Sequence, residues 1–72
     1  MNKARRKQIQ VAIKAIEDLV HDILDSEQDA FDNTPESLQE SDRGQESIEA
    51  QENLEAAIDA LEEAASCLED IV

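Results

Sequence analysis

Residues 54–72 read LEAAIDALEEAASCLEDIV, and this stretch decides the fold. Its apolar residues recur at alternating steps of four and three: Leu54, Ile58, Leu61, Ala65, Leu68 and Val72. That spacing places them on one face of an α-helix that packs against another helix. Ala, Glu and Leu dominate the stretch and are strong helix formers. We therefore expect a helix over residues 45–71.

The N-terminal part of the chain carries a matching apolar pattern. Alternating steps of four and three again separate its members, which are Ile9, Ile13, Ile16, Val20 and Ile23. Leu19 and Leu24 lie beside this seam and widen it. The next seam position is occupied by Glu27, so the seam weakens there. We expect a helix over residues 3–31, about as long as the second helix.

The connector, residues 32–44, contains the single proline and the single glycine of the chain. Pro35 ends the first helix, because the residue before a proline avoids helical angles. Thr34 and Pro35 fit the cap and the first position of a new helix, and Ser37 with Glu40 fits a capping box. We expect a short helical segment over residues 35–41. It either breaks or bends around Gly44, or it runs straight into the second helix.

Two helices of matched length and one short connector predict antiparallel packing. The distribution of charge agrees, since this packing sets the basic N-terminus (Lys3, Arg5, Arg6 and Lys7) beside acidic residues of the second helix (Glu62, Glu63, Glu69 and Asp70). The fold class that we expect is all-α. The 72 residues form a single domain, a coiled-coil-like antiparallel two-helix hairpin.

A lone hairpin of this size is marginal in water, and both seams are wider than a strict two-position stripe. The extra width predicts self-association, most simply as a homodimer that forms a four-helix bundle. Higher cyclic assemblies remain open. The residues expected to mediate self-association are Ile9, Ile13, Ile16, Leu19, Val20, Ile23, Leu24, Leu54, Ile58, Leu61, Leu68 and Ile71.

The net charge is −13, and it is unevenly distributed. All nineteen acidic residues follow residue 15, where Arg43 is the sole base. Such a chain is repelled by nucleic acid and by anionic membranes, so its expected partner is a basic protein surface. Two stripes of carboxylates follow the helices: Asp18, Asp22, Asp25 and Asp29, then Glu52, Glu55, Asp59 and Glu62. They either imitate the phosphates of a duplex or form an ordinary solvated face. Arg43 is a secondary candidate contact.

The residues with possible chemistry form no active site. Asp18 lies three residues before His21, a spacing used in di-iron bundles, but the absence of inward-facing partner glutamates favours an exposed histidine in a helical charge network. Carboxylates recur every three residues at Glu46, Glu49, Glu52 and Glu55, as in magnesium-dependent all-α pyrophosphohydrolases. That row drifts around the helix, which favours a solvated face. Cys67 is expected to be a packed, inert thiol. We expect no enzyme, no catalytic residue, no metal and no cofactor.

A single cysteine suits a reducing compartment, and no apolar stretch has the length of a signal peptide core or a membrane span. We therefore expect a cytoplasmic protein. Residues 31–44, FDNTPESLQESDRG, and residues 53–64, NLEAAIDALEEA, resemble small uncharacterised acidic helical proteins of bacteriophages and prophages. The resemblance implies a viral origin and action in the bacterial cytoplasm. The function that we expect is binding and blocking a basic surface of a host protein. A structural self-assembling module and a protein that binds a small ligand or metal are the alternatives.

Overall fold

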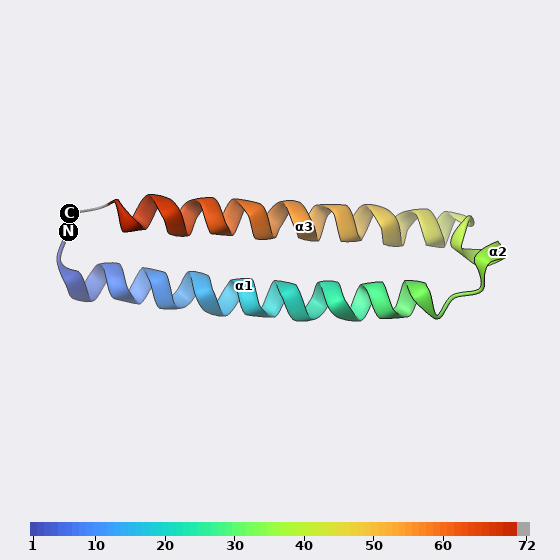
Figure 1. Ribbon diagram of the computed structural model, residues 1–72, viewed down its shortest axis with the longest axis horizontal. Helices are drawn as coiled ribbons and strands as arrows, with labels where there is room; N and C mark the ends of the chain where they lie inside the picture. Colours follow the sequence, from blue (N-terminus) through green and yellow to red (C-terminus); the bar gives the residue numbers. More distant parts are fainter. Residues whose placement is uncertain (71–72) are drawn as a thin grey trace.

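The computed structural model describes residues 1–70, and these form a helical hairpin (Figure 1). The elements are α1 (Lys3–Asp32), α2 (Glu36–Gln39) and α3 (Asp42–Glu69). The two long helices lie side by side and antiparallel, so the start of α1 lies beside the end of α3. The molecule measures 54 × 15 × 12 Å, which makes it a flat rod. The prediction of an all-helical fold with two long helices packed together is confirmed.

The ends of α1 are held by polar side chains. At its start, the Asn2 side chain accepts a hydrogen bond of 2.9 Å from the Arg5 backbone N–H. At its end, the Thr34 hydroxyl donates to the Ala30 carbonyl at 2.8 Å. Thr34 therefore closes α1. The prediction that Thr34 caps the short helix is wrong. Pro35 itself is the N-cap residue of α2, and no side chain caps that helix.

The helix α3 begins three residues earlier than expected, because Ser41 is its cap. The Ser41 side chain accepts a hydrogen bond of 3.3 Å from the Gly44 N–H. The prediction of a capping box formed by Ser37 and Glu40 is wrong, because the N-cap residues of α2 and α3 are Pro35 and Ser41. Glu40 and Ser41 separate α2 from α3, so the short helix is not continuous with the long one.

Gly44 lies in the first turn of α3, which continues unbroken through it, and its backbone touches α2. A Cβ at Gly44 would fall on the Gln39 carbonyl and lie 2.8 Å from the Gln39 Cα. The Gln39 side chain in turn donates to two carbonyls at the end of α1, those of Phe31 at 3.0 Å and Thr34 at 2.9 Å. The connector is thereby closed against both long helices.

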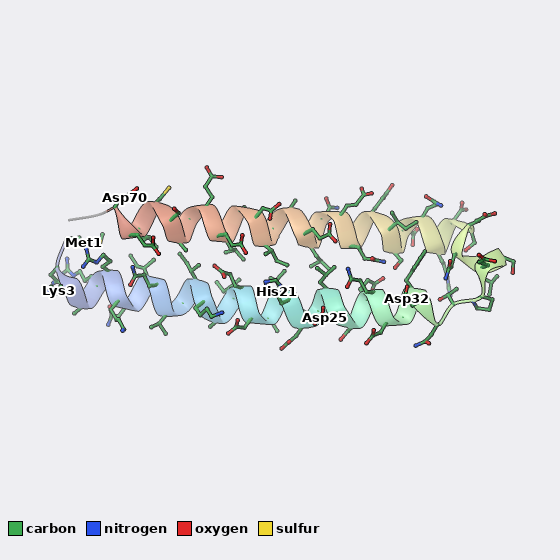
Figure 2. All side chains as sticks on the ribbon, in the orientation of Figure 1. Met1, Lys3, His21, Asp25, Asp32 and Asp70 are labelled. Carbon is green, nitrogen blue, oxygen red and sulfur yellow. The ribbon has the colours of Figure 1, made fainter. Side chains whose placement is uncertain are left out.

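Side chains of α1 and α3 fill the seam between the two long helices (Figure 2). Its apolar members are at least half-buried: Ile13, Val20, Leu24 and Phe31 from α1, and Leu54, Ile58, Leu61, Ala65 and Leu68 from α3. Among the described apolar residues, only Leu24 and Ile58 are buried, with 7% and 6% of their surface exposed. The predicted seam of α3 is confirmed as far as Leu68, and Val72 lies outside the described residues.

The predicted seam of α1 is wrong at every second position. Ile16 and Ile23 are each 48% exposed and Ile9 is 37% exposed, whereas Ile13 and Val20 face α3. The inward row instead continues through Leu24, which the sequence had placed on the flank. The physical reason is that α1 carries two adjacent apolar rows, and spacing alone does not select between them. The row that faces α3 is the one that reaches Phe31 at the connector.

Half of the inward row of α1 is polar or charged. Arg6, Gln10, Glu17 and Glu27 occupy its remaining positions and are all half-buried. A seam of this composition buries little apolar area and stabilises a lone hairpin only weakly. Among the described residues, no helix combines the length and the hydropathy that crossing a membrane requires.

Candidate interaction surfaces

The apolar residues that the seam leaves out form a second row on α1. Its members are Ile9, Ala12, Ile16, Leu19 and Ile23, at alternating steps of three and four. All five are exposed. A corresponding row on α3 consists of small residues, half-buried or exposed: Ala50, Ala57, Ala60, Ala64 and Cys67. We call these two rows together the apolar face.

Both rows lie on the same broad side of the hairpin. Ile16 immediately precedes the seam residue Glu17, and Ala57 immediately precedes the seam residue Ile58. Two antiparallel helices are related by an approximate two-fold axis perpendicular to the plane of the hairpin. A rotation about this axis exchanges the two helices but does not exchange the two broad sides of the hairpin. Residues that directly precede a seam position therefore lie on the same broad side in α1 and in α3. The isoleucine row and the alanine row therefore lie next to each other.

The opposite broad side carries the carboxylates. It contains Asp18, Asp25 and Asp32 from α1 and Glu52, Glu55, Asp59, Glu62 and Glu69 from α3, all exposed. We call this set the acidic face. Asp22 and Asp29, the other members of the predicted stripe on α1, are also exposed and lie on the outer edge of that helix. The eight predicted carboxylates thus lie away from the apolar face.

A short basic stretch interrupts the acidic face near the start of α1. Lys14 Nζ donates a hydrogen bond of 2.9 Å to Asp18, and the two charges form an ion pair one helical turn apart. This hydrogen bond, with the attraction of the same carboxylate, raises the pKa of Lys14 above its usual value. Val11 lies on this side too, and 58% of its surface is exposed.

A polar group crosses the seam close to the connector. The Ser47 hydroxyl donates a hydrogen bond of 2.6 Å to Glu27 Oε1, and the Gln51 side-chain amide donates to the Ser47 oxygen at 3.4 Å. The Glu27 carboxylate, which weakens the apolar pattern in the sequence, therefore has a partner from α3. Sequence spacing identifies Glu27 as a seam residue but does not reveal Ser47, because Ser47 is one of several small polar residues near the start of α3.

A pocket of about 400 Å³ lies at the connector end, where α1, α2 and α3 meet. Its walls are formed by Glu27, Ala30, Phe31, Thr34, Leu38, Ser41, Arg43, Gly44 and Ser47. Leu38 is 54% exposed at its rim. The predicted contact residue Arg43 is one of the residues that line the pocket. The pocket combines an apolar wall with one cation and one carboxylate.

The described residues contain no group of three or more His, Cys, Asp and Glu side chains that could hold a metal ion. His21 is exposed on α1, and Glu46, Glu49, Glu52 and Glu55 are all exposed as their row turns around α3. The prediction of a packed thiol is wrong, since Cys67 is exposed. Cys67 precedes the seam residue Leu68, which places it on the apolar face and outside the seam.

Comparisons of the chain with protein-family models, curated proteins and solved structures found no significant match.

Proposed function

We propose that this protein is a self-associating interaction protein, in which two hairpins pair through their apolar faces and present their acidic faces to a basic partner. The observation that carries the proposal is the separation of the two residue classes onto opposite sides of one flat hairpin. The pairing produces a four-helix bundle and covers the exposed isoleucines. It leaves both acidic faces in solvent.

The hairpin alone gives a physical reason to self-associate. Five large apolar side chains of α1 and α2 are about half exposed: Val11, Ile16, Leu19, Ile23 and Leu38. Three of them belong to the apolar face. The broad side of the hairpin, of which the apolar face is the middle part, has an outline of 54 × 15 Å or about 800 Å². A typical stable interface buries about 800 Å² of each partner, so the hairpin is large enough to form one.

The acidic face fits a partner that normally binds a polyanion. Its carboxylates are exposed and lie at regular intervals along two long helices. Regular negative charge attracts basic clefts over long distances and accelerates association with them. Together with the resemblance of residues 31–44 and 53–64 to phage proteins, this supports a nucleic-acid-binding or defence protein of a bacterial host as the partner. Binding would block the basic surface of that protein.

A pull-down from bacterial lysate with matched charge variants tests this assignment. Glu52→Lys with Asp59→Lys reverses two charges on the acidic face. Glu49→Lys with Glu63→Lys reverses two exposed charges outside it and serves as the control. We expect a retained protein that moderate salt releases, that the first variant loses and that the control keeps. Equal retention by both variants, or none by the wild type, would contradict the assignment.

The pocket at the connector supports a second candidate function, the binding of a small anionic ligand. Arg43 supplies a cation, and Phe31 and Leu38 supply apolar walls. A thermal-shift series with nucleotides and divalent metal ions tests it, with Arg43→Gln as the control. Stabilisation of the wild type that the variant lacks would support a ligand site, and the absence of any shift would exclude the compounds tested.

A further inference from the structure

The charge of the hairpin is concentrated at one end. Residues 1–16 carry five bases and no acid, and residues 55–70 carry six acids and no base, so the end where they meet has a net charge of −1. Residues 17–54 carry thirteen acids and Arg43, a net charge of −12. These residues form the connector end of the rod in Figure 1.

This asymmetry distinguishes the two symmetric ways of pairing two apolar faces. If both connectors lie at the same end, two regions of charge −12 face each other. Packed helices are about 8–10 Å apart, which is close to the Debye length of about 8 Å at physiological salt, so this repulsion is only partly screened. If one hairpin is reversed, each region of charge −12 faces a nearly neutral one. Charge therefore favours the reversed pairing.

The apolar rows are positioned for the same arrangement. Ile16 is the midpoint of the row from Ile9 to Ile23, and Ala57 is the midpoint of the span from Ala50 to Ala64. The hydrogen bond between Ser47 and Glu27 sets the register of the two helices. Along the rod, away from the connector, Ile16 lies eleven residues from Glu27 on α1, and Ala57 lies ten residues from Ser47 on α3. Both midpoints therefore lie at nearly the same level along the rod.

A single two-fold axis at this level brings both rows into contact with their own copies. Ile16 meets the partner subunit's Ile16, and Ile9 meets the partner subunit's Ile23. In the same arrangement Ala57 meets the partner subunit's Ala57, and Ala50 meets the partner subunit's Ala64. Such an interface is isologous, as two-fold dimers require.

We propose that the apolar face binds a second copy of this chain with the hairpin reversed, so that the two acidic connectors lie at opposite ends of the dimer. This inference rests on the proposed self-association and specifies its geometry. Each dimer then carries its two acidic faces back to back on opposite outer surfaces. Its two connector pockets are separated by roughly the full 54 Å length of the rod.

Disulfide trapping in a Cys67→Ser background tests the contact at the two-fold axis. Ala57→Cys is expected to form a covalent dimer on mild oxidation, because the proposed two-fold axis brings the two Cα atoms at this position within disulfide range. Ala64→Cys and Ala50→Cys are each expected to stay monomeric on a denaturing gel, whereas an equimolar mixture of the two is expected to cross-link. Cross-linking between Ile16→Cys and Ala57→Cys in place of Ala57→Cys with itself would overturn the reversed orientation.

Spin labels at the connector separate a wrong orientation from a failure to associate. Ser37 is exposed on α2, so Ser37→Cys in the same Cys67→Ser background is a suitable labelling site. The reversed dimer predicts a label separation near the 54 Å length of the rod. In a proven dimer, a label separation under about 30 Å, which is the length of about 20 helical residues, would show that both connectors lie at one end. That result overturns this inference alone, whereas a monomer in sedimentation would overturn it together with the proposed self-association.

Discussion

Ser47 donates a 2.6 Å hydrogen bond to the half-buried carboxylate of Glu27, and this contact joins α3 to α1 beside the connector. The Ser47→Ala variant leaves the carboxylate without this donor. We expect it to lower the free energy of unfolding by about 1–2 kcal/mol, the range for a hydrogen bond to a charged group in a partly solvated place. Urea unfolding followed by circular dichroism, at one fixed protein concentration, measures the change.

Replacing the acceptor as well tests whether the loss comes from an unpaired carboxylate. Glu27→Leu combined with Ser47→Ala removes both polar partners and is expected to recover most of the stability. Ser26→Ala, an exposed serine next to Glu27, is the control and is expected to be near neutral. A Ser47→Ala variant as stable as Ser26→Ala would show that the contact contributes nothing.

Gly44 is expected to resist substitution although it lies inside a helix. Alanine is favoured over glycine by about 1 kcal/mol in a free helix. Here, however, a Cβ would collide with the Gln39 backbone. We expect Gly44→Ala to be destabilising by about 1–3 kcal/mol, the usual cost of overpacking. The control is Gln45→Ala at the next, exposed position, and thermal unfolding compares the two. A Gly44→Ala variant that melts above the wild type would refute the close approach of α2.

The Gln39 side chain donates hydrogen bonds to the Phe31 carbonyl in α1 and to the Thr34 carbonyl just after it. We expect Gln39→Ala to cost about 1–2 kcal/mol, and Gln39→Glu to cost more, because a carboxylate would then face two carbonyl oxygens without a proton to donate. Glu40→Gln, an exposed neighbour, is the control for the change of charge. If Gln39→Glu unfolds at the wild-type urea concentration, the amide has no structural role.

The sequence predicts the hairpin because two heptad patterns of similar length flank one proline. It also predicts the inward row of α3 as far as Leu68, since that helix carries a single row of large apolar residues. The row of α1 is only partly predictable. Ile9, Ile16 and Ile23 are better hydrophobes than the polar residues that face α3 in their place, and the choice depends on register, which spacing does not encode.

The connector shows the same limit at shorter range. Thr34, Ser37 and Ser41 are all plausible cap residues by type, and only the path of the chain selects Ser41. Gly44 reads as a breaker in the sequence, but its role is to let α2 approach α3. The carboxylates of the acidic face were predictable as exposed because carboxylates at this density do not pack, whereas their position opposite the apolar face required the structure.

Salt is expected to act in opposite directions on the two proposed interactions. Each chain carries a net charge of −13, so two copies repel each other and screening favours the dimer. Raising the ionic strength from about 0.01 M to about 0.15 M shortens the Debye length from roughly 30 Å to 8 Å. We expect the dimer dissociation constant to fall severalfold over this range in sedimentation equilibrium, while binding to a basic partner weakens. A dimer that salt dissociates would be inconsistent with an apolar interface.

Substitution of two exposed apolar residues on opposite broad sides tests dimerisation through the apolar face most sharply. Leu19 lies on the apolar face and Val11 on the acidic face, and each is 58% exposed. Sedimentation equilibrium of the wild type and of Val11→Asp is expected to give twice the chain mass of 8.0 kDa. Leu19→Asp is expected to raise the dissociation constant at least about a hundredfold, equivalent to about 2.8 kcal/mol. A monomeric wild type, or equal effects of the two substitutions, would contradict the account.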